Sequence, residues 1–242
     1  MISTVTEYVQ KDPQLALYAE HMNMLMIEND STLAEFKLSI SQKYKRHRPR
    51  LLILLGNPAL LMRDEYRELW GDIPIVLCSE ENYLGPQETY TKKQAIATAD
   101  RTPLTQLADP YNMVLLYSNL YLDENIQLIC HIVPEIKKFI FIGDARQINQ
   151  TNNLDIRNKL KKTHPNVEYQ FITPQDMTTN QLLDSLYFVD PKTTGVLFSS
   201  WFYKTTFAGN TSLVSNAHKL IGTTAAPYSL SIWRTSPKKT AE

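Results

Sequence analysis

The feature that most constrains this chain is an apolar run, Phe139 to Ile142, which follows two lysines and stops at Gly143-Asp144. A short continuous apolar run bounded by turn residues is typical of a strand buried on both faces of a parallel sheet. Residues just beyond the carboxyl end of such a strand face the ligand crevice. We therefore predict that Asp144 stands at a candidate binding edge.

Similar apolar runs recur along the chain, with helical patterns between them. Strands are predicted at 15–18, 51–55, 73–78, 113–117, 138–143, 167–172, 195–198 and 227–233, and helices at 3–11, 31–46, 58–70, 123–133, 150–162, 178–188 and 211–221. Strand starts at intervals of about thirty residues suit βαβ units. Because crossovers are right-handed, we predict an α/β fold with two Rossmann-like lobes, each a parallel sheet with helices on both faces.

Composition narrows the class of protein. The 242 residues are 43% hydrophobic, which suits one large domain or two small lobes. The formal net charge is zero, so we expect no nucleic-acid partner. The basic stretch at 43–50 is interpreted as a solvated helix end. Cys78 and Cys130 lie in apolar segments and are expected to be buried free thiols.

Several chemical signatures are absent from the sequence. No glycine-rich phosphate loop follows a strand, no Gly-x-Ser-x-Gly elbow occurs, and the five histidines lack metal-ligand spacing. We therefore expect no cofactor, no metal and no enzymatic activity. No stretch has the length of a membrane span or the form of a signal peptide. The chain is either cytoplasmic or a piece of a larger membrane-anchored protein.

Polar or aromatic residues follow four of the predicted strands, and they are the candidate ligand-binding residues: Asn57, Glu81, Asn82, Tyr83, Asp144, Arg146, Ser199 and Trp201. They would point into one cleft if two sheets faced each other. Simpler roles compete, since Asn57 can cap the next helix, Glu80 and Glu81 can be solvated, and Asp144 can order a loop. Trp201 is the best single candidate, because a tryptophan in such a loop has no evident packing role.

Three segments carry a resemblance to periplasmic-binding-protein-like (type I) domains. Residues 125–144, NIQLICHIVPEIKKFIFIGD, resemble the entry into the second lobe of that family, and 50–59 and 70–78 resemble segments of its first lobe. The likeness runs from about residue 14 to 233. Solute-binding proteins of ABC transporters and extracytoplasmic sensor domains of two-component histidine kinases share this pattern. The loop at 79–86 and the long stretch after it are more similar to the sensors, particularly the Bacteroides type.

The resemblance implies a domain organisation and a function. Residues 1–118 would form a first lobe that lacks its first strand, together with a crossing segment; 119–233 would form the second lobe, and 234–242 a disordered tail. The lobes would close on a small polar ligand, such as a sugar stacked on Trp201, outside the cytoplasm. The chain would then be a shortened piece of a membrane-anchored receptor with a kinase elsewhere, and a homodimer is compatible with this reading.

Three alternatives stay open at this point. The first is a solute-binding component of an ABC transporter. The second is a two-lobed α/β enzyme, such as a transferase, which would need a nucleotide or metal site. The third is a receiver-type module with Asp144 as phosphoacceptor, although receivers need an acidic cluster after their first strand and residues 15–21 offer only Glu20.

Overall fold

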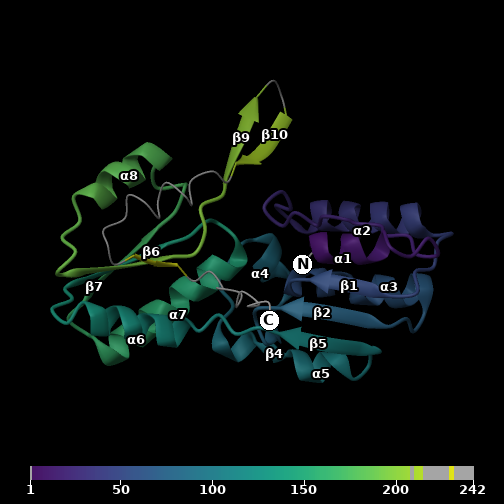
Figure 1. Ribbon diagram of the computed structural model, residues 1–242, viewed down its shortest axis with the longest axis horizontal. Coiled ribbons are helices and arrows are strands. Elements are labelled where there is room, and N and C mark those ends of the chain that lie inside the picture. Colours follow the sequence, from purple (N-terminus) through teal and green to yellow (C-terminus); the bar gives the residue numbers. More distant parts are fainter. Residues whose placement is uncertain (1, 208–209, 215–228, 232–242) are drawn as a thin grey trace.

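The computed structural model describes residues 2–207, 210–214 and 229–231. It is a mixed α/β fold whose two larger sheets are parallel, with strand orders β1-β2-β5 and β11-β8-β6-β7. The first sheet lies toward one end of an elongated molecule and the second toward the other (Figure 1). The predicted α/β class with parallel sheets is therefore confirmed, while the lobe boundaries stay a prediction.

The first sheet consists of β1 (Leu52–Leu55), β2 (Ile75–Ser79) and β5 (Met113–Tyr117). Its helical partners are α2 (Asp30–Tyr44), the 3-10 helix η1 (Asn57–Met62), α3 (Arg63–Trp70) and α5 (Leu104–Ala108). The inward row of the sheet, Leu54 and Leu77, packs with Leu33 of α2 and Leu60 of η1 in one core. Burial of these side chains supplies the main stabilisation of this part.

Two predictions for this part are wrong. Strand β1 is not buried on both faces, because Ile53 and Leu55 are 40% and 45% exposed. The strands follow one another in sequence order, and right-handed connections between such neighbours place the helices on one face only. Residues 15–18 form no strand, because they pair with neither edge of the first sheet; Leu17 and Tyr18 are exposed. The predicted N-terminal helix is present as α1 (Ile2–Val9).

The long stretch after β2 is built from short elements rather than one irregular loop. It contains β3 (Tyr83–Leu84), α4 (Gln87–Thr91), the 3-10 helix η2 (Thr98–Asp100) and β4 (Thr102–Pro103). Strands β3 and β4 pair in antiparallel fashion. In Figure 1, α4 and β4 lie between the two sheets. Periodicity in the sequence is weak here because each of these elements is only two to five residues long.

The second sheet is covered on both faces. It contains β6 (Lys138–Ile142), β7 (Glu168–Ile172), β8 (Thr194–Phe198) and β11 (Ser229–Ser231), with α6 (Leu122–Ile132), α7 (Gln147–Thr163) and α8 (Thr179–Tyr187). Phe139 and Phe141 pack with α6 and α7, whereas Ile140 and Ile142 pack with α8. The prediction that Phe139 to Ile142 form a strand buried on both faces is confirmed.

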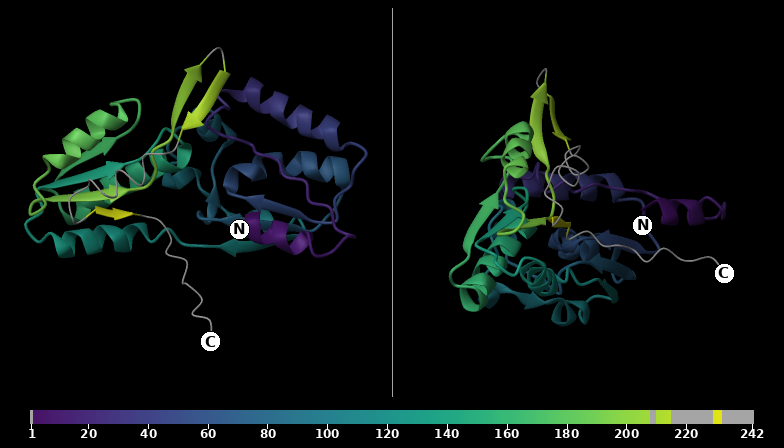
Figure 2. Two further views of the ribbon diagram at one scale, coloured as in Figure 1. Left: turned by 45° about the horizontal axis from the view of Figure 1, so that its top comes forward. Right: turned by 60° about the vertical axis from the view of Figure 1, so that its left-hand side comes forward.

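The order of the second sheet reverses beside β6. Strand β6 pairs with β7 on one side and with β8 on the other. The chain thus passes from β6 through α7 to β7 and then returns through α8 to β8. Such a switch point opens a crevice at the carboxyl ends of the two strands. Arrows of both sheets run toward the middle of the molecule in Figures 1 and 2, so their carboxyl edges face each other.

The C-terminal part differs from its prediction. Instead of a helix from residue 211, the chain forms a hairpin of β9 (Tyr203–Phe207) and β10 (Asn210–Val214). Threonine, valine and tyrosine favour strands, and the two segments can pair with each other. The rest of the predicted helix and the predicted tail at 234–242 lie outside the described residues. Both cysteines are free, as predicted, but they are half-buried rather than buried.

Candidate functional site

The carboxyl edge of the first sheet is held by a small buried network. Asn57, at the start of η1, donates from its amide Nδ2 to the carbonyls of Glu81 and Tyr83 and accepts from the Ser79 hydroxyl. The Glu81 backbone N–H donates to Ser79 Oγ at 3.0 Å. Asn57 therefore does not cap the helix, as one interpretation expected; it ties the loop after β2 to the loop after β1.

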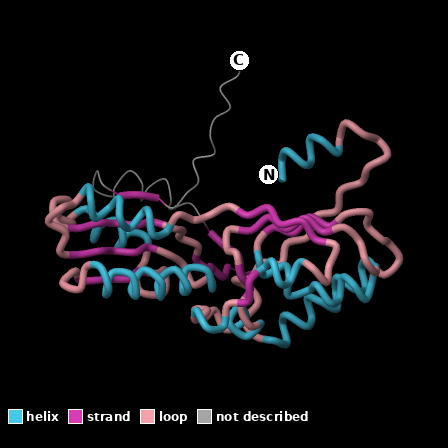
Figure 3. Tube along the Cα trace, turned by 90° about the horizontal axis from the view of Figure 1, so that it is seen from below, coloured by secondary structure: helices cyan, strands magenta, loops and turns pink. Residues whose placement is uncertain are grey.

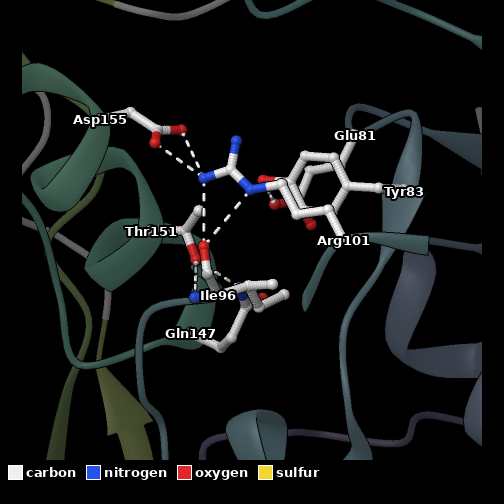
Figure 4. A network of polar contacts seen from close by, with 7 residues as sticks. All are labelled: Glu81, Tyr83, Ile96, Arg101, Gln147, Thr151 and Asp155. Atoms are coloured by element: carbon white, nitrogen blue, oxygen red, sulfur yellow. Dashed lines mark hydrogen bonds and ion pairs between the residues drawn. The ribbon is translucent and has the colours of Figure 1, made fainter. Parts of the chain in front are cut away.

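A second network continues from this loop toward the second sheet (Figure 4). The Tyr83 hydroxyl donates to Glu81 Oε1 at 2.8 Å. The guanidinium of Arg101 lies over the Tyr83 ring, 4.6 Å from its centroid, and its Nη2 donates to Asp155 Oδ1 and Oδ2 at 2.7 and 2.9 Å. Since Asp155 belongs to α7, this pair joins the two parts of the molecule. We call Glu81, Tyr83, Arg101 and Asp155 the bridge.

A third contact lies beside the bridge. The Ile96 N–H donates to Thr151 Oγ1 of α7 at 2.9 Å, and Gln147 Nε2 donates to the same hydroxyl oxygen at 2.6 Å. Ile96 and Thr151 have no solvent-exposed surface. Arg101 also donates to the Ile96 carbonyl, at 3.1 Å from Nη2. The segment between β2 and β5 thus contacts α7 through polar bonds, of which the Ile96–Thr151 bond is fully buried and the Arg101–Asp155 pair partly exposed.

Glu81 is the electrostatically unusual member of the bridge. It is 8% exposed, so the prediction that it is solvated is wrong, whereas Glu80 is exposed as expected. Burial raises the pKa of Glu81 to about 7, and the Tyr83 hydrogen bond and the Arg101 charge only partly oppose this effect. Burial and the neighbouring Glu81 also raise the pKa of Tyr83, which therefore stays a proton donor. Glu81 changes charge in the neutral pH range.

Asp144 organises the carboxyl edge of the second sheet. It has no exposed surface. Its Oδ1 accepts from the Arg146 N–H and from Asn149 Nδ2, at 2.9 and 2.8 Å, and its Oδ2 accepts from the Ser200 hydroxyl at 2.7 Å. Arg146 Nε lies 2.9 Å from Oδ1. These bonds join the end of β6, the start of α7 and the loop after β8 at the switch point. The lack of exposed surface argues against a phosphoacceptor role.

Trp201 does not face a cleft. It is 2% exposed and packs with Ile142, Leu182 and Phe198 in the core that α8 shares with the sheet, while its Nε1 donates to Thr179 Oγ1 at 3.1 Å. The premise that it lacks a packing role is wrong, because the indole is buried in the core formed by α8 and the sheet. A sugar stacked on Trp201 is incompatible with this position.

The predicted residues therefore fall into two groups rather than one. Asn57, Glu81, Asn82 and Tyr83 lie at the edge of the first sheet, and Asp144, Arg146, Ser199 and Trp201 at that of the second. Within these groups Asn82 is exposed, and Tyr83, Arg146 and Ser199 are half-buried. Sequence reasoning missed Arg101 and Asp155, which join the groups. Neither follows a predicted strand, so the rule that selected the other candidates could not select them.

Two clefts on the surface lie elsewhere. The larger has a volume of about 300 Å³ and is lined by residues such as Lys37, Arg63, Gln87 and Asp100. None of the eight predicted residues lines either cleft. Among the described residues, no group of three or more His, Cys, Asp or Glu side chains could hold a metal ion. None of the described helices combines the length and apolar character that crossing a bilayer requires.

Comparisons with known proteins identify no relative of this chain. No protein-family model matches the sequence, and neither a curated protein nor a solved structure does.

Proposed function

We propose that this chain is the ligand-binding sensor domain of a membrane-anchored two-component histidine kinase, and that it acts outside the cytoplasm. In this proposal it consists of two α/β lobes of the periplasmic-binding-protein-like type, which close on a small polar ligand. The observation that carries the proposal is the bridge, in which Arg101 connects Tyr83 at the edge of the first sheet to Asp155 of α7, the helix that follows β6 of the second sheet. Facing carboxyl edges are a common place for ligands in α/β proteins.

The contacts between the two parts suit a joint that can move. The bonds described across it are polar, namely the Arg101–Asp155 ion pair and the Ile96–Thr151 hydrogen bond. Arg101 and Asp155 keep 18% and 30% of their side-chain surface exposed, so water can replace each partner at modest cost. A ligand that binds one arrangement of the lobes better shifts the population toward it. In the parent receptor, that shift would be the signal.

The side chains that retain accessible surface are the proposed ligand contacts. These are Asn82 and Tyr83 on the first sheet's edge, with Arg146 and Ser199 on the second's. Arg146 also lies over the Phe202 ring, 4.8 Å from its centroid. An amide, a phenol, a hydroxyl and a guanidinium favour a ligand rich in hydrogen-bonding groups. Asn57 and Asp144 would act indirectly by holding these loops in place.

One observation favours an enzyme as the second candidate. A carboxyl group with a pKa of about 7 inside the protein is what a general base or acid needs, and Glu81 meets this condition. In the enzyme hypothesis, Glu81 would move a proton of a substrate bound at the same edge. This hypothesis predicts turnover, whereas the sensor and a transporter component both predict recovery of the ligand unchanged.

A thermal-shift screen tests the proposal directly. The chain is heated with sugars, amino acids and other polar metabolites, because a ligand that binds only the folded state raises Tm. Each hit is then tested on Arg146→Ala and on Arg157→Ala, an exposed arginine farther along the same helix. The proposal requires that Arg146→Ala lose most of the shift and that Arg157→Ala keep it. Equal shifts in both variants would exclude this edge as the site, and chromatography of the hit after incubation separates binding from turnover.

A further inference from the structure

The first sheet carries an uncovered apolar face. Strand register aligns Ile53 with Val76 and Val114 in one row, and Leu55 with Cys78 and Leu116 in the next. All six residues are apolar, and we call them the open face. Ile53, Leu55, Val114 and Leu116 are 40 to 58% exposed, and Val76 and Cys78 are half-buried. Parallel sheets are ordinarily covered on both faces, and large exposed apolar patches mark contact surfaces.

The N-terminal helix lies on the same side as this face. Figure 3 shows α1 above the strands of the first sheet, while the helices that build its core lie below them. The right-hand view of Figure 2 agrees, since α1 projects away from α2 and the sheet. None of its described side chains is among the residues packed against the first core. Helix α1 thus lies on the side of the open face without covering it.

Several properties of α1 suit it to this surface. Val5 and Val9 lie one turn apart and are half-buried, whereas Glu7 and Tyr8 are exposed. The helix has eight residues, without an acidic first turn or a basic last turn. Helices shorter than about 12 residues are marginal in water and depend on packing. Its length of about 12 Å is close to the width of three strands, roughly 10 Å.

The connection between α1 and the rest of the chain allows α1 to move toward the open face. Residues 10–17 are all exposed. The first contacts with α2 after them are made by Tyr18, whose ring lies edge-on to that of Tyr44 at 6.0 Å, and by Glu20, which accepts hydrogen bonds from Lys43 and Tyr44. An extended chain spans at most about 3.3 Å per residue, so residues 10–17 can reach roughly 25 Å.

We propose that α1 docks across the open face, with Val5 and Val9 against the two apolar rows. Helix α1 is then a strap that closes the second face of the first sheet. This inference does not depend on the proposed function. The proposed occupant of the open face is α1 of the same chain. The experiments below distinguish this case from coverage of the face by a second copy of the protein.

Cys78, in the middle of the open face, is a native reporter. In a Cys130→Ser background, the rate at which a maleimide modifies Cys78 is measured in the whole chain and in a chain lacking residues 1–11. If α1 covers the face nine-tenths of the time, removal should raise the rate about tenfold. Equal rates would overturn the proposal.

Cross-linking gives an independent result that does not require the shortened chain to fold. In the same background, a short bismaleimide is added to Val5→Cys and, as the matched control, to Glu7→Cys on the opposite side of α1. The proposal predicts that Val5→Cys reacts with Cys78 within one chain, at monomer mass, and severalfold faster than Glu7→Cys. Equal yields, or a product only at dimer mass, would contradict docking of α1 in the same chain.

Discussion

The two parallel sheets differ in how many faces they bury. In the second sheet, Phe139 and Phe141 pack against α6 and α7 and Ile140 packs against α8. In the first sheet, Leu54 and Leu77 are buried, whereas Ile53 and Leu55 on the opposite face are exposed. The physical cause is the strand order. Strand β6 lies between β7 and β8, so the right-handed connections place helices on both faces of the second sheet. Strands β1, β2 and β5 are added in sequence order in one direction, so the helices of the first sheet lie on one face. Apolar content alone does not reveal this difference.

The largest expected effect compares one leucine from each sheet. Leu197 of β8 has no exposed surface, and Leu197→Ala should lower the free energy of unfolding by about 2–5 kcal/mol. Leu116 of β5 is 54% exposed, and Leu116→Ala should cost less than about 1 kcal/mol in a chain lacking residues 1–11. Urea unfolding followed by circular dichroism measures both. Similar losses of stability would show that the two sheets are equally covered, and would contradict the difference in burial described above.

The next effect is the pH dependence from Glu81. Its pKa is raised from 4.5 to about 7, so the folded chain holds this proton more tightly than the unfolded chain does. The free energy of unfolding should therefore fall as pH rises from about 4.5 to 7, by roughly 3 kcal/mol from this group, and change no further above that range.

The matched variants isolate that contribution. Glu81→Gln should remove this part of the pH dependence and be more stable than the parent at pH 8, whereas Glu80→Gln, at an exposed neighbour, should keep the parent profile. Urea unfolding at several pH values supplies the data. A Glu81→Gln profile parallel to that of the parent would show that Glu81 titrates as a solvated group.

A smaller effect concerns the bridge that couples the two sheets. In a double-mutant cycle with Arg101→Met and Asp155→Asn, the coupling energy should be about 1 kcal/mol, because the pair is only partly buried. Amide hydrogen exchange should also show faster opening of α4 and of the first turns of α7 in either variant. Strict additivity in the cycle would mean that the ion pair does not link the two parts.

The smallest effect is expected on the open face itself. Val114 is 58% exposed, so Val114→Thr should change the free energy of unfolding by no more than about 0.5 kcal/mol in a chain lacking residues 1–11. The same substitution at Val196, which is buried in the second sheet, should cost more, because it places a hydroxyl in an apolar core. Equal costs at the two positions would remove the distinction between the sheets.

The sequence predicted the elements with strong local patterns and missed what depends on distant neighbours. The buried run at Phe139 to Ile142 and the helix with Leu33 and Ile40 were confirmed, since their periodicity reflects their own burial. Residues 15–18 have strand-like composition, but a strand needs a partner, which no local pattern reveals. Trp201 was misjudged because its packing partners come from α8.

The candidate site shows the same division. The rule that polar residues after parallel strands face a crevice selected Asn57, Glu81 and Asp144, and all three lie at sheet edges. Their burial and bonding were not predictable, because Asn149, Ser200 and Arg101 reach them from separate segments. The bridge residue Asp155 lies within α7, where a carboxylate ordinarily indicates only a solvated helix face.

The central claim is that a small polar ligand binds between the facing edges and changes the arrangement of the two sheets. The most direct test is small-angle X-ray scattering of the chain with and without the metabolite that gives the largest thermal shift, repeated with Arg146→Ala. We expect a smaller radius of gyration with the metabolite and no change in Arg146→Ala. A metabolite that binds both proteins equally and leaves the radius of gyration unchanged would contradict it.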